Sequence, residues 1–265
     1  MKVVILAGGL GTRLAEETAL RPKPMVEIGG KPILWHIMKI YSTYGFNEFV
    51  ICLGYRGYMI KEYFANYSLH NSDVTIDTLG NEVKVHQRRA EPWEVTLVDT
   101  GSSSGTGGRL RRVREYLNGE RFCFTYGDAV SNLNIPAVVD LHRAEKSMVT
   151  VTAIQPTSKY GILSFDGPRV TDFREKPPEV GSWINGGFFV VSPEAIDYIE
   201  SDETHWEHAP LTQLVKEGSV TAYQHGGFWQ CMDTLRDKRL LEELWSTREA
   251  PWKIWEDGDL ERGLG

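Results

Sequence analysis

The segment Lys2-Val-Val-Ile-Leu-Ala7 runs directly into Gly8-Gly9-Leu10-Gly11-Thr12-Arg13. The first segment is short, apolar and rich in β-branched residues, which is typical of a strand buried on both faces of a parallel sheet. The three glycines let the backbone turn sharply and bring several N–H groups close to a ligand, and Arg13 adds a planar cation suited to phosphate. Two other phosphate motifs do not fit, because a P-loop ends in Gly-Lys-Ser/Thr and a dinucleotide fingerprint needs a third spaced glycine before a helix. This stretch therefore predicts an α/β fold with a phosphate-binding loop after its first strand.

The residues that follow alternate between helical and strand-like patterns. Helices are indicated by apolar residues at helical spacing, and strands by short apolar runs between turn residues. The predicted elements are a helix over 31–44, a strand over 47–53, a helix over 57–67, a hairpin of 74–79 and 82–87, a strand over 95–99, a helix over 108–117 and a strand over 121–126. Parallel strands with crossover helices are the simplest arrangement of the first part.

From residue 148 onward the pattern favours strands. The predicted elements are strands over 149–154, 161–165, 170–174, 187–191 and 219–224, and helices over 193–200, 209–217 and 235–247. No repeat or low-complexity linker separates this part from the first. We therefore predict one α/β domain over 1–255, built on a Rossmann-like, mixed, mainly parallel sheet flanked by helices, with an added β-rich portion and a tail over 256–265.

The composition bears on the class of protein and on its partners. A formal net charge of −7 over 265 residues argues against a nucleic-acid partner, which requires a basic face. The three cysteines form no C-x-x-C pair, so neither a disulfide framework nor a zinc site is indicated. Met1 leads directly into the strand without a signal-peptide pattern, and no apolar run approaches the ~20 residues that span a bilayer. We expect a cytoplasmic protein without nucleic-acid or membrane partners.

Three further residues are of types that handle phosphate and metal. Lys23 stands between two prolines, on a stiff segment that presents its ammonium at a fixed place. Asp128 follows the strand predicted over 121–126, where ligand sites form in open α/β sheets, and Asp233 closes another apolar stretch. Such carboxylates bind Mg²⁺, which neutralises the charge of phosphate groups, although a single aspartate is also explained as a cap or turn residue.

The run Leu-Ala-Gly-Gly-Leu-Gly-Thr-Arg-Leu over 6–14, with Pro-Lys-Pro-Met over 22–25, resembles the signature of the sugar nucleotidyltransferases. The resemblance implies that the nucleotide is wrapped by the first loop, namely Leu6, Ala7, Gly8, Gly9, Gly11 and Thr12. It implies that Arg13 and Lys23 are catalytic and bind the phosphates being exchanged. It also implies a Mg²⁺ ion held by Asp128, which contacts the nucleotide as well, and by Asp233. The sequence departs from the usual Gly-Asp-Gly at Ala129, whose methyl group would lie near metal and sugar.

Longer segments resemble one subfamily, the glucose-1-phosphate cytidylyltransferases. These segments are 31–38, 60–67, 91–101, 106–110 and 228–237. The resemblance implies that Ser104 and Arg109 contact a cytosine nucleotide, and a guanidinium is able to satisfy the O2 and N3 acceptors of cytosine. It implies that the sugar phosphate is bound by Glu175, Lys176, Asn185 and Gly186. The stretch over 156–162 is less similar, which leaves the identity of the hexose open.

The activity that the resemblance implies is transfer of a cytidylyl group from CTP to α-D-glucose 1-phosphate, giving CDP-glucose and pyrophosphate. The sugar-phosphate oxygen would attack the α-phosphorus in line, without a protein nucleophile. Residues 1–147 would bind the nucleotide, and residues 148–255 would bind the sugar and complete the metal site. Two alternatives remain: the same reaction with UTP, dTTP or another hexose 1-phosphate, and a regulatory domain that binds a sugar nucleotide without catalysis. The resemblance also implies a homo-oligomer, such as a hexamer.

Overall fold

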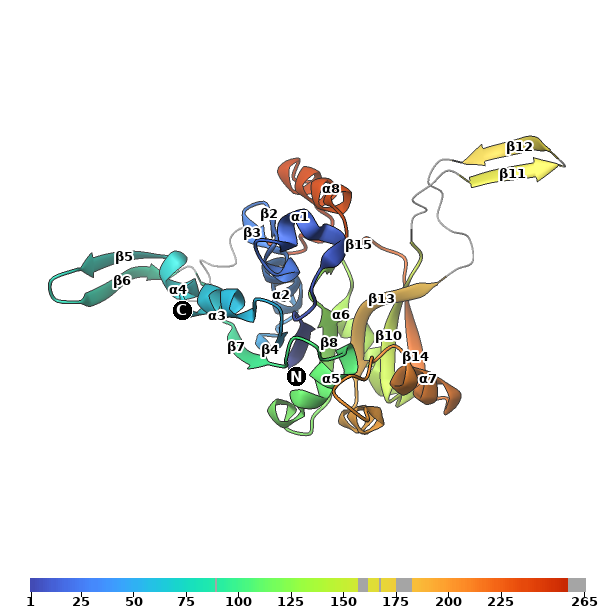
Figure 1. The fold of residues 1–265 in the computed structure, drawn as a ribbon, viewed down its shortest axis with the longest axis horizontal. Helices are drawn as coiled ribbons and strands as arrows, with labels where there is room; N and C mark the ends of the chain where they lie inside the picture. The colour runs from blue at the N-terminus through green and yellow to red at the C-terminus, as the bar shows by residue number, and fades with distance from the viewer. Residues whose placement is uncertain (89, 157–161, 167, 175–182, 257–265) are drawn as a thin grey trace.

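The computed structural model describes the chain apart from residues 89, 157–161, 167, 175–182 and 257–265 (Figure 1). Its centre is a seven-stranded sheet of order β14-β10-β13-β8-β1-β4-β7. These strands are β1 (Val3–Leu6), β4 (Glu48–Leu53), β7 (Glu94–Asp99), β8 (Phe122–Tyr126), β10 (Val149–Ile154), β13 (Ile184–Val191) and β14 (Val220–His225). All of them run in one direction except β13, which is antiparallel to both neighbours. The predicted mixed, mainly parallel sheet is confirmed.

Helices cover both faces of the sheet, as the burial of β1 requires. Val3 and Ile5 pack into one apolar cluster with α2 (Ile33–Thr43) and α6 (Ile135–Glu145). Val4 and Leu6 pack into the opposite cluster, with α5 (Thr106–Arg112) and α7 (Ala209–Lys216). Two 3-10 helices, η3 (Arg114–Leu117) and η4 (Pro193–Tyr198), complete the second face. A strand whose successive side chains point to opposite faces is apolar throughout only when both faces are covered.

Short elements complete the structure around the sheet. They are η1 (Thr12–Leu14), α1 (Ala15–Thr18), η2 (Lys23–Met25), β2 (Glu27–Ile28), β3 (Lys31–Pro32), α3 (Gly57–Ala65), α4 (Tyr67–His70), β9 (Ala129–Ser131), β15 (Trp229–Cys231) and α8 (Leu235–Ser246). The predicted hairpin is present as β5 (Ser72–Asp77) and β6 (Glu82–Arg88), and it projects away from the sheet (Figure 1). A second hairpin consists of β11 (Ile162–Asp166) and β12 (Arg169–Arg174). No helix within the described residues has the length and apolar character needed to cross a membrane.

Several boundaries differ from the sequence prediction, each for a local reason. Helix α2 begins only at Ile33, because Lys31 and Pro32 pair with β2. The sequence pattern missed α6, although Asn134 caps its start by accepting a hydrogen bond from the Ala137 N–H. The predicted helices over 57–67 and 108–117 are each broken in two, at Asn66 and Val113.

Candidate active site

A cavity of about 550 Å³ opens where the carboxyl ends of β1 and β8 meet the first residues of β13. That volume lies within the range of small-molecule sites. Because β13 is antiparallel, it begins at the edge of the sheet where β1, β4, β7 and β8 end. The cavity therefore combines the glycine loop after β1, the turn after β8 and the start of β13, and it lies at the carboxyl edge where open α/β sheets bind ligands.

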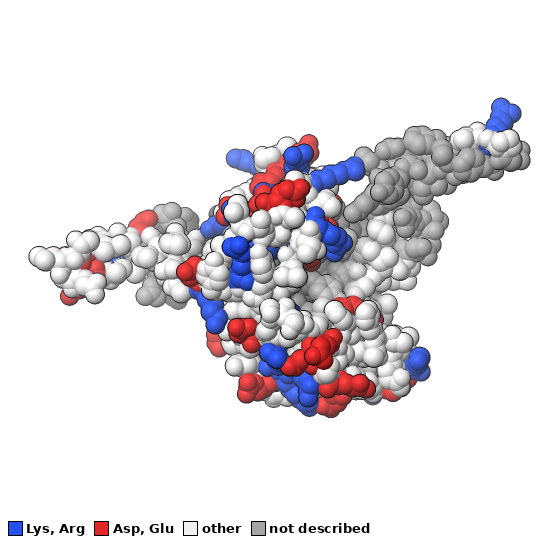
Figure 2. Space-filling view, viewed as in Figure 1, with Lys and Arg blue, Asp and Glu red and all other residues white. Residues whose placement is uncertain are grey.

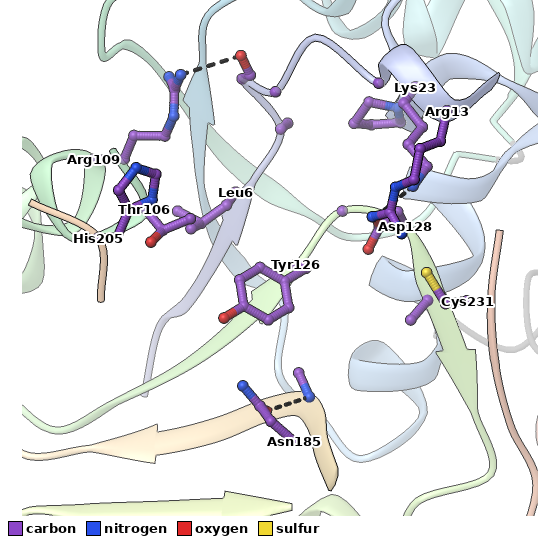
Figure 3. A pocket seen from close by; sticks show the side chains of 18 of the residues that line it. Leu6, Arg13, Lys23, Thr106, Arg109, Tyr126, Asp128, Asn185, His205 and Cys231 are labelled. Atoms are coloured by element: carbon purple, nitrogen blue, oxygen red, sulfur yellow. Dashed lines mark hydrogen bonds and ion pairs between the residues drawn. The ribbon is translucent and has the colours of Figure 1, made fainter. Parts of the chain in front are cut away.

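Lys23, Arg13 and Asp128 line one side of this cavity (Figure 3), and Asp233 pairs with both cations. The Lys23 ammonium donates to Asp128 Oδ2 at 2.7 Å and to Asp233 Oδ1 at 2.6 Å. Arg13 pairs with Asp233 Oδ2 at 2.7 Å. The two aspartates are far apart in sequence, and they meet because β15 pairs with β9, with Cys231 opposite Ala129. The structure thus brings together the two predicted phosphate-binding cations and both predicted metal ligands.

The charges in this cluster support one another. Burial by itself would lower the pKa of the Lys23 ammonium, but attraction to Asp128 and hydrogen bonds to both aspartates raise that pKa above its ordinary value. Burial also favours protonation of Asp233, but the hydrogen bond and attraction from Lys23 and the charge of Arg13 lower the pKa of that carboxyl below 3.8. Lys23 is therefore charged and Asp233 ionised at neutral pH.

The same carboxylates suit a divalent metal ion. Both bind one ammonium nitrogen, so their oxygens converge on a single point between them. Carboxylate oxygens are the ligands that Mg²⁺ prefers. The Cys231 thiol also lies in the group, since one ligand atom from each of Asp128, Cys231 and Asp233 lies within 4.8 Å of the others. Ala129 is buried against the apolar core and also lines the cavity, next to Asp128.

Arg109 braces the opposite end of the cavity, where the nucleotide was predicted to bind. Its side chain is buried, and Nη1 donates to the Leu53 carbonyl at 3.0 Å, the Thr100 hydroxyl at 2.8 Å and the Gly101 carbonyl at 2.8 Å. Its Nη2 donates to the Gly8 carbonyl at 3.1 Å (Figure 3). Burial lowers the pKa of this guanidinium. Arg109 therefore fixes the glycine loop against the ends of two strands, in addition to lining the cavity.

The glycine loop, whose residues are predicted to bind the nucleotide, lies along the cavity. The predicted residues that line the cavity here are Leu6, Ala7, Gly8, Gly9, Gly11 and Thr12. Gly11 has φ +64, a left-handed conformation that favours glycine. A side chain at Gly8 would overlap the Arg109 guanidinium, so the close approach of loop and arginine requires glycine there.

A loop from the second half of the chain packs on the start of α5. The Gly105 N–H donates to the Asp202 carbonyl at 2.8 Å, and the Gly108 N–H donates to the Thr204 carbonyl at 3.0 Å. A β-carbon at Gly108 would overlap Asp202, so glycine permits this contact. Ser104, predicted to contact the nucleotide, lines the cavity, and its hydroxyl donates to the Thr100 carbonyl.

The start of β13 forms the third side of the cavity. Asn185 and Gly186, which are predicted to bind the sugar phosphate, line the cavity, and a bulge between β10 and β13 occurs at this point. Gly187 has φ +79, and its N–H donates to Asn185 Oδ1 at 2.8 Å, which fixes the orientation of the side-chain amide (Figure 3). The predicted Glu175 and Lys176 lie outside the described residues.

Sequence reasoning missed several residues that line the cavity. They are Thr106, Tyr126, His205, Trp229 and Cys231. Tyr126 could have been found, because it ends the strand two residues before the predicted Asp128. His205 had no such signal, because it reaches the cavity only through the packing of its loop on α5.

Charged side chains of both signs lie on the face of the molecule seen in Figure 2. On the described part of the face in Figure 2, positive and negative side chains are interspersed, and they do not form one continuous positive area. A nucleic-acid-binding face is expected to be predominantly basic.

The whole chain is similar to known nucleotidyltransferases. A glucose-1-phosphate cytidylyltransferase from Salmonella typhi is 59% identical over 97% of this chain and 100% of its own length. A mannose-1-phosphate guanyltransferase from Saccharomyces cerevisiae is 30% identical over 91% of this chain and 63% of its own length. The crystal structure of HddC from Yersinia pseudotuberculosis matches with a TM-score of 0.68 over 92% of this chain and 99% of that chain, and its 24% identity makes this a likeness of fold. The nucleotidyl transferase family model matches residues 2–257, and the chain belongs to that family.

Proposed function

We propose that the protein transfers a cytidylyl group from CTP to α-D-glucose 1-phosphate, releasing pyrophosphate and forming CDP-glucose. The observation that carries this proposal is the 59% identity to a glucose-1-phosphate cytidylyltransferase over the full length of that relative. The cavity supports it, because cations, paired carboxylates and a glycine loop converge there. The substrates are a nucleotide and a sugar phosphate.

In this proposal each side of the cavity has a distinct role. The glycine loop, Ser104 and Arg109 bind the nucleotide, which assigns this task to residues 1–147. Arg13 and Lys23 leave the aspartates and neutralise the phosphates as pyrophosphate departs, so they stabilise charge that develops during the reaction. The protein holds the sugar-phosphate oxygen in line with the α-phosphorus, and no side chain becomes covalently attached.

Magnesium is the metal we assign to the aspartate pair. Asp128 and Asp233 would hold it, and the bound ion would supply positive charge next to the phosphates. The convergence of the two carboxylates on the Lys23 nitrogen supports this assignment, since the same oxygens face the point that a cation occupies.

The sugar phosphate is assigned to residues of the second half, 148–255. Asn185 and Gly186 lie at the cavity. Glu175 and Lys176 complete the proposed set on the strength of the resemblance alone.

The proposal includes a homo-oligomer, such as a hexamer. The projecting β5–β6 hairpin supports it, because Ile76, Leu79 and Val83 are exposed there by 54%, 97% and 55%. A two-stranded hairpin is marginally stable alone, and exposed apolar groups of this kind favour contact with another chain. Light scattering coupled to gel filtration will give the mass in solution, and a monomer would contradict this part.

The decisive test of the reaction is a pyrophosphate-release matrix of CTP, UTP, dTTP and GTP against several hexose 1-phosphates. We expect the highest kcat/KM for CTP with glucose 1-phosphate. Lys23→Ala and Asp128→Ala should each lower kcat by about 100-fold or more, the usual cost of removing a group that stabilises the transition state. Asp140→Ala is the matched control, because Asp140 is exposed on α6 and pairs only at the surface, with Arg143 at 3.5 Å.

Two outcomes would contradict the proposal. Release of pyrophosphate with another nucleotide at higher kcat/KM would reassign the donor. Normal turnover by Lys23→Ala and Asp128→Ala, with unchanged thermal unfolding, would refute the assigned roles.

A further inference from the structure

Glu207 connects two sides of the cavity without lining it. Its Oε1 accepts from the Tyr126 hydroxyl, and its Oε2 accepts from the Thr106 hydroxyl at 2.7 Å. Tyr126 ends β8 and Thr106 begins α5. The Glu207 carboxylate therefore links the side of the cavity assigned to the sugar phosphate with the side assigned to the nucleotide. Tyr126 and Thr106 both line the cavity (Figure 3).

The hydrogen bond from Tyr126 to Glu207 determines whether the tyrosine hydroxyl can donate to a substrate or accept from it. A tyrosine hydroxyl has one proton and two acceptor lone pairs. The Tyr126 proton is donated to Glu207, so the lone pairs of its oxygen can accept a hydrogen bond.

The Tyr126 ring is held beside the residues assigned to the sugar. A β-carbon at Gly187 would come within 2.6 Å of Tyr126 Cδ2, so ring and strand are in close contact.

Glu207 is not required to hold its own loop in place. Backbone bonds from Gly105 and Gly108 dock the loop on α5, and the Trp206 side chain is fully buried in the core. The backbone N–H of Trp206 also donates to the Thr106 hydroxyl at 2.9 Å, independently of the Glu207 carboxylate. Loss of the Glu207 carboxylate therefore affects the direction of the Tyr126 O–H more than the position of the loop.

We propose that Glu207 is a positioning residue that makes Tyr126 a hydrogen-bond acceptor for one hydroxyl of the sugar 1-phosphate. Tyr126 thereby becomes a specificity-determining residue, since it accepts from a substrate hydroxyl and rejects a group that cannot donate. This inference rests on the proposed function, because the sugar is placed at Asn185 and Gly186 by that proposal.

The test uses glucose 1-phosphate and its 2-, 3-, 4- and 6-deoxyfluoro analogues, because carbon-bound fluorine cannot donate a hydrogen bond. For each protein we take the ratio of kcat/KM for an analogue to kcat/KM for glucose 1-phosphate. For one analogue this ratio should be about 10-fold lower in the wild-type protein than in Tyr126→Phe, the usual loss for one neutral hydrogen bond. Comparing each analogue across variants removes its intrinsic reactivity. Glu207→Ala should lose the same discrimination as Tyr126→Phe, and the double variant should behave like Tyr126→Phe alone.

A matched control is Glu217→Ala, because Glu217 accepts from the Tyr198 hydroxyl at 2.6 Å on the exposed surface, outside the cavity. It should leave the analogue pattern unchanged. An identical analogue pattern in wild type and Tyr126→Phe would overturn the inference, and so would a Glu207→Ala effect that adds in full to that of Tyr126→Phe. Absence of wild-type turnover with CTP and glucose 1-phosphate would instead refute the proposed function, so the two failures are distinguishable.

Discussion

Replacing Lys23 with methionine should tighten the binding of a divalent metal in the absence of nucleotide, while it lowers catalysis. The Lys23 ammonium now lies 2.7 Å from Asp128 Oδ2 and 2.6 Å from Asp233 Oδ1, where a metal ion would bind. A metal ion that reaches these oxygens must displace the ammonium. Methionine keeps an unbranched side chain of similar length and removes the competing charge.

The magnitude follows from the two bonds that are lost. A hydrogen bond to a charged group contributes about 1.5–3 kcal/mol, so two of them oppose metal binding by about 3 kcal/mol at the low end. This corresponds to about 100-fold in affinity, and water that replaces the carboxylates around Lys23 offsets part of it. We expect Mn²⁺ to bind Lys23→Met about 10- to 100-fold more tightly than it binds wild type.

Free Mn²⁺ measured by electron paramagnetic resonance gives this affinity directly, without turnover. Lys238→Met is the matched control, because Lys238 pairs with Glu17 rather than with the metal-binding aspartates. Adding CTP should strengthen Mn²⁺ binding to wild type more than to Lys23→Met, since the phosphates then attract Lys23 away from the carboxylates. Equal or weaker Mn²⁺ binding by Lys23→Met would refute the competition between ammonium and metal.

Three other predictions concern stability and binding. Burial lowers the pKa of His142 from 6.5 to about 4, so the free energy of unfolding should rise with pH between about 4 and 6.5, and His142→Gln should reduce that slope in urea titrations. Gly187→Ala should destabilise the protein by more than the ~1–2 kcal/mol expected for left-handed strain alone, because the added methyl group also meets Tyr126, and it should raise KM for the sugar phosphate. Gly119→Ala, at φ +68 in open space, measures the strain alone. Equal costs of the two variants would contradict this reasoning. Arg109→Lys should cost about 2 kcal/mol in thermal unfolding and raise KM for CTP, since an ammonium cannot reproduce the hydrogen bonds of the buried guanidinium; unchanged values of both would show that those bonds are dispensable.

Much of the fold could be predicted because its signals are local. The buried strand before Gly8 and the apolar runs of the later strands each carry their pattern in a few residues, and the sheet follows from them. Helix α6 was missed even though its start carries Asn134 and a proline, both of which are helix-start signals. The breaks at Asn66 and Val113 were missed because apolar spacing alone does not locate a change of helix type.

In the candidate site, too, local motifs could be predicted from the sequence and contacts between distant segments could not. Arg13, Lys23 and Asp128 lie in contiguous motifs, so the sequence was sufficient to select them. The pairing of Lys23 with both aspartates could not be predicted, because it depends on a strand pair more than 95 residues apart in sequence, Cys231 with Ala129. Glu207 was missed for a similar reason. Its contact with Tyr126 depends on the packing of the backbone of residues 202–206 against Gly105, Gly107 and Gly108.

The reversed direction of β13 has a consequence for how substrate range could change over evolution. Its first two residues, Ile184 and Asn185, are exposed at the cavity edge, whereas the strand from Gly186 to Val191 is buried. If Asn185 binds the sugar as proposed, mutations at the entrance of this strand will alter sugar preference while the buried remainder keeps the sheet intact. A strand that ended at this edge, as β8 does, would place a variable position next to the metal-binding turn instead. The residues proposed to set acceptor preference and those proposed to bind phosphate can therefore change independently within one sheet.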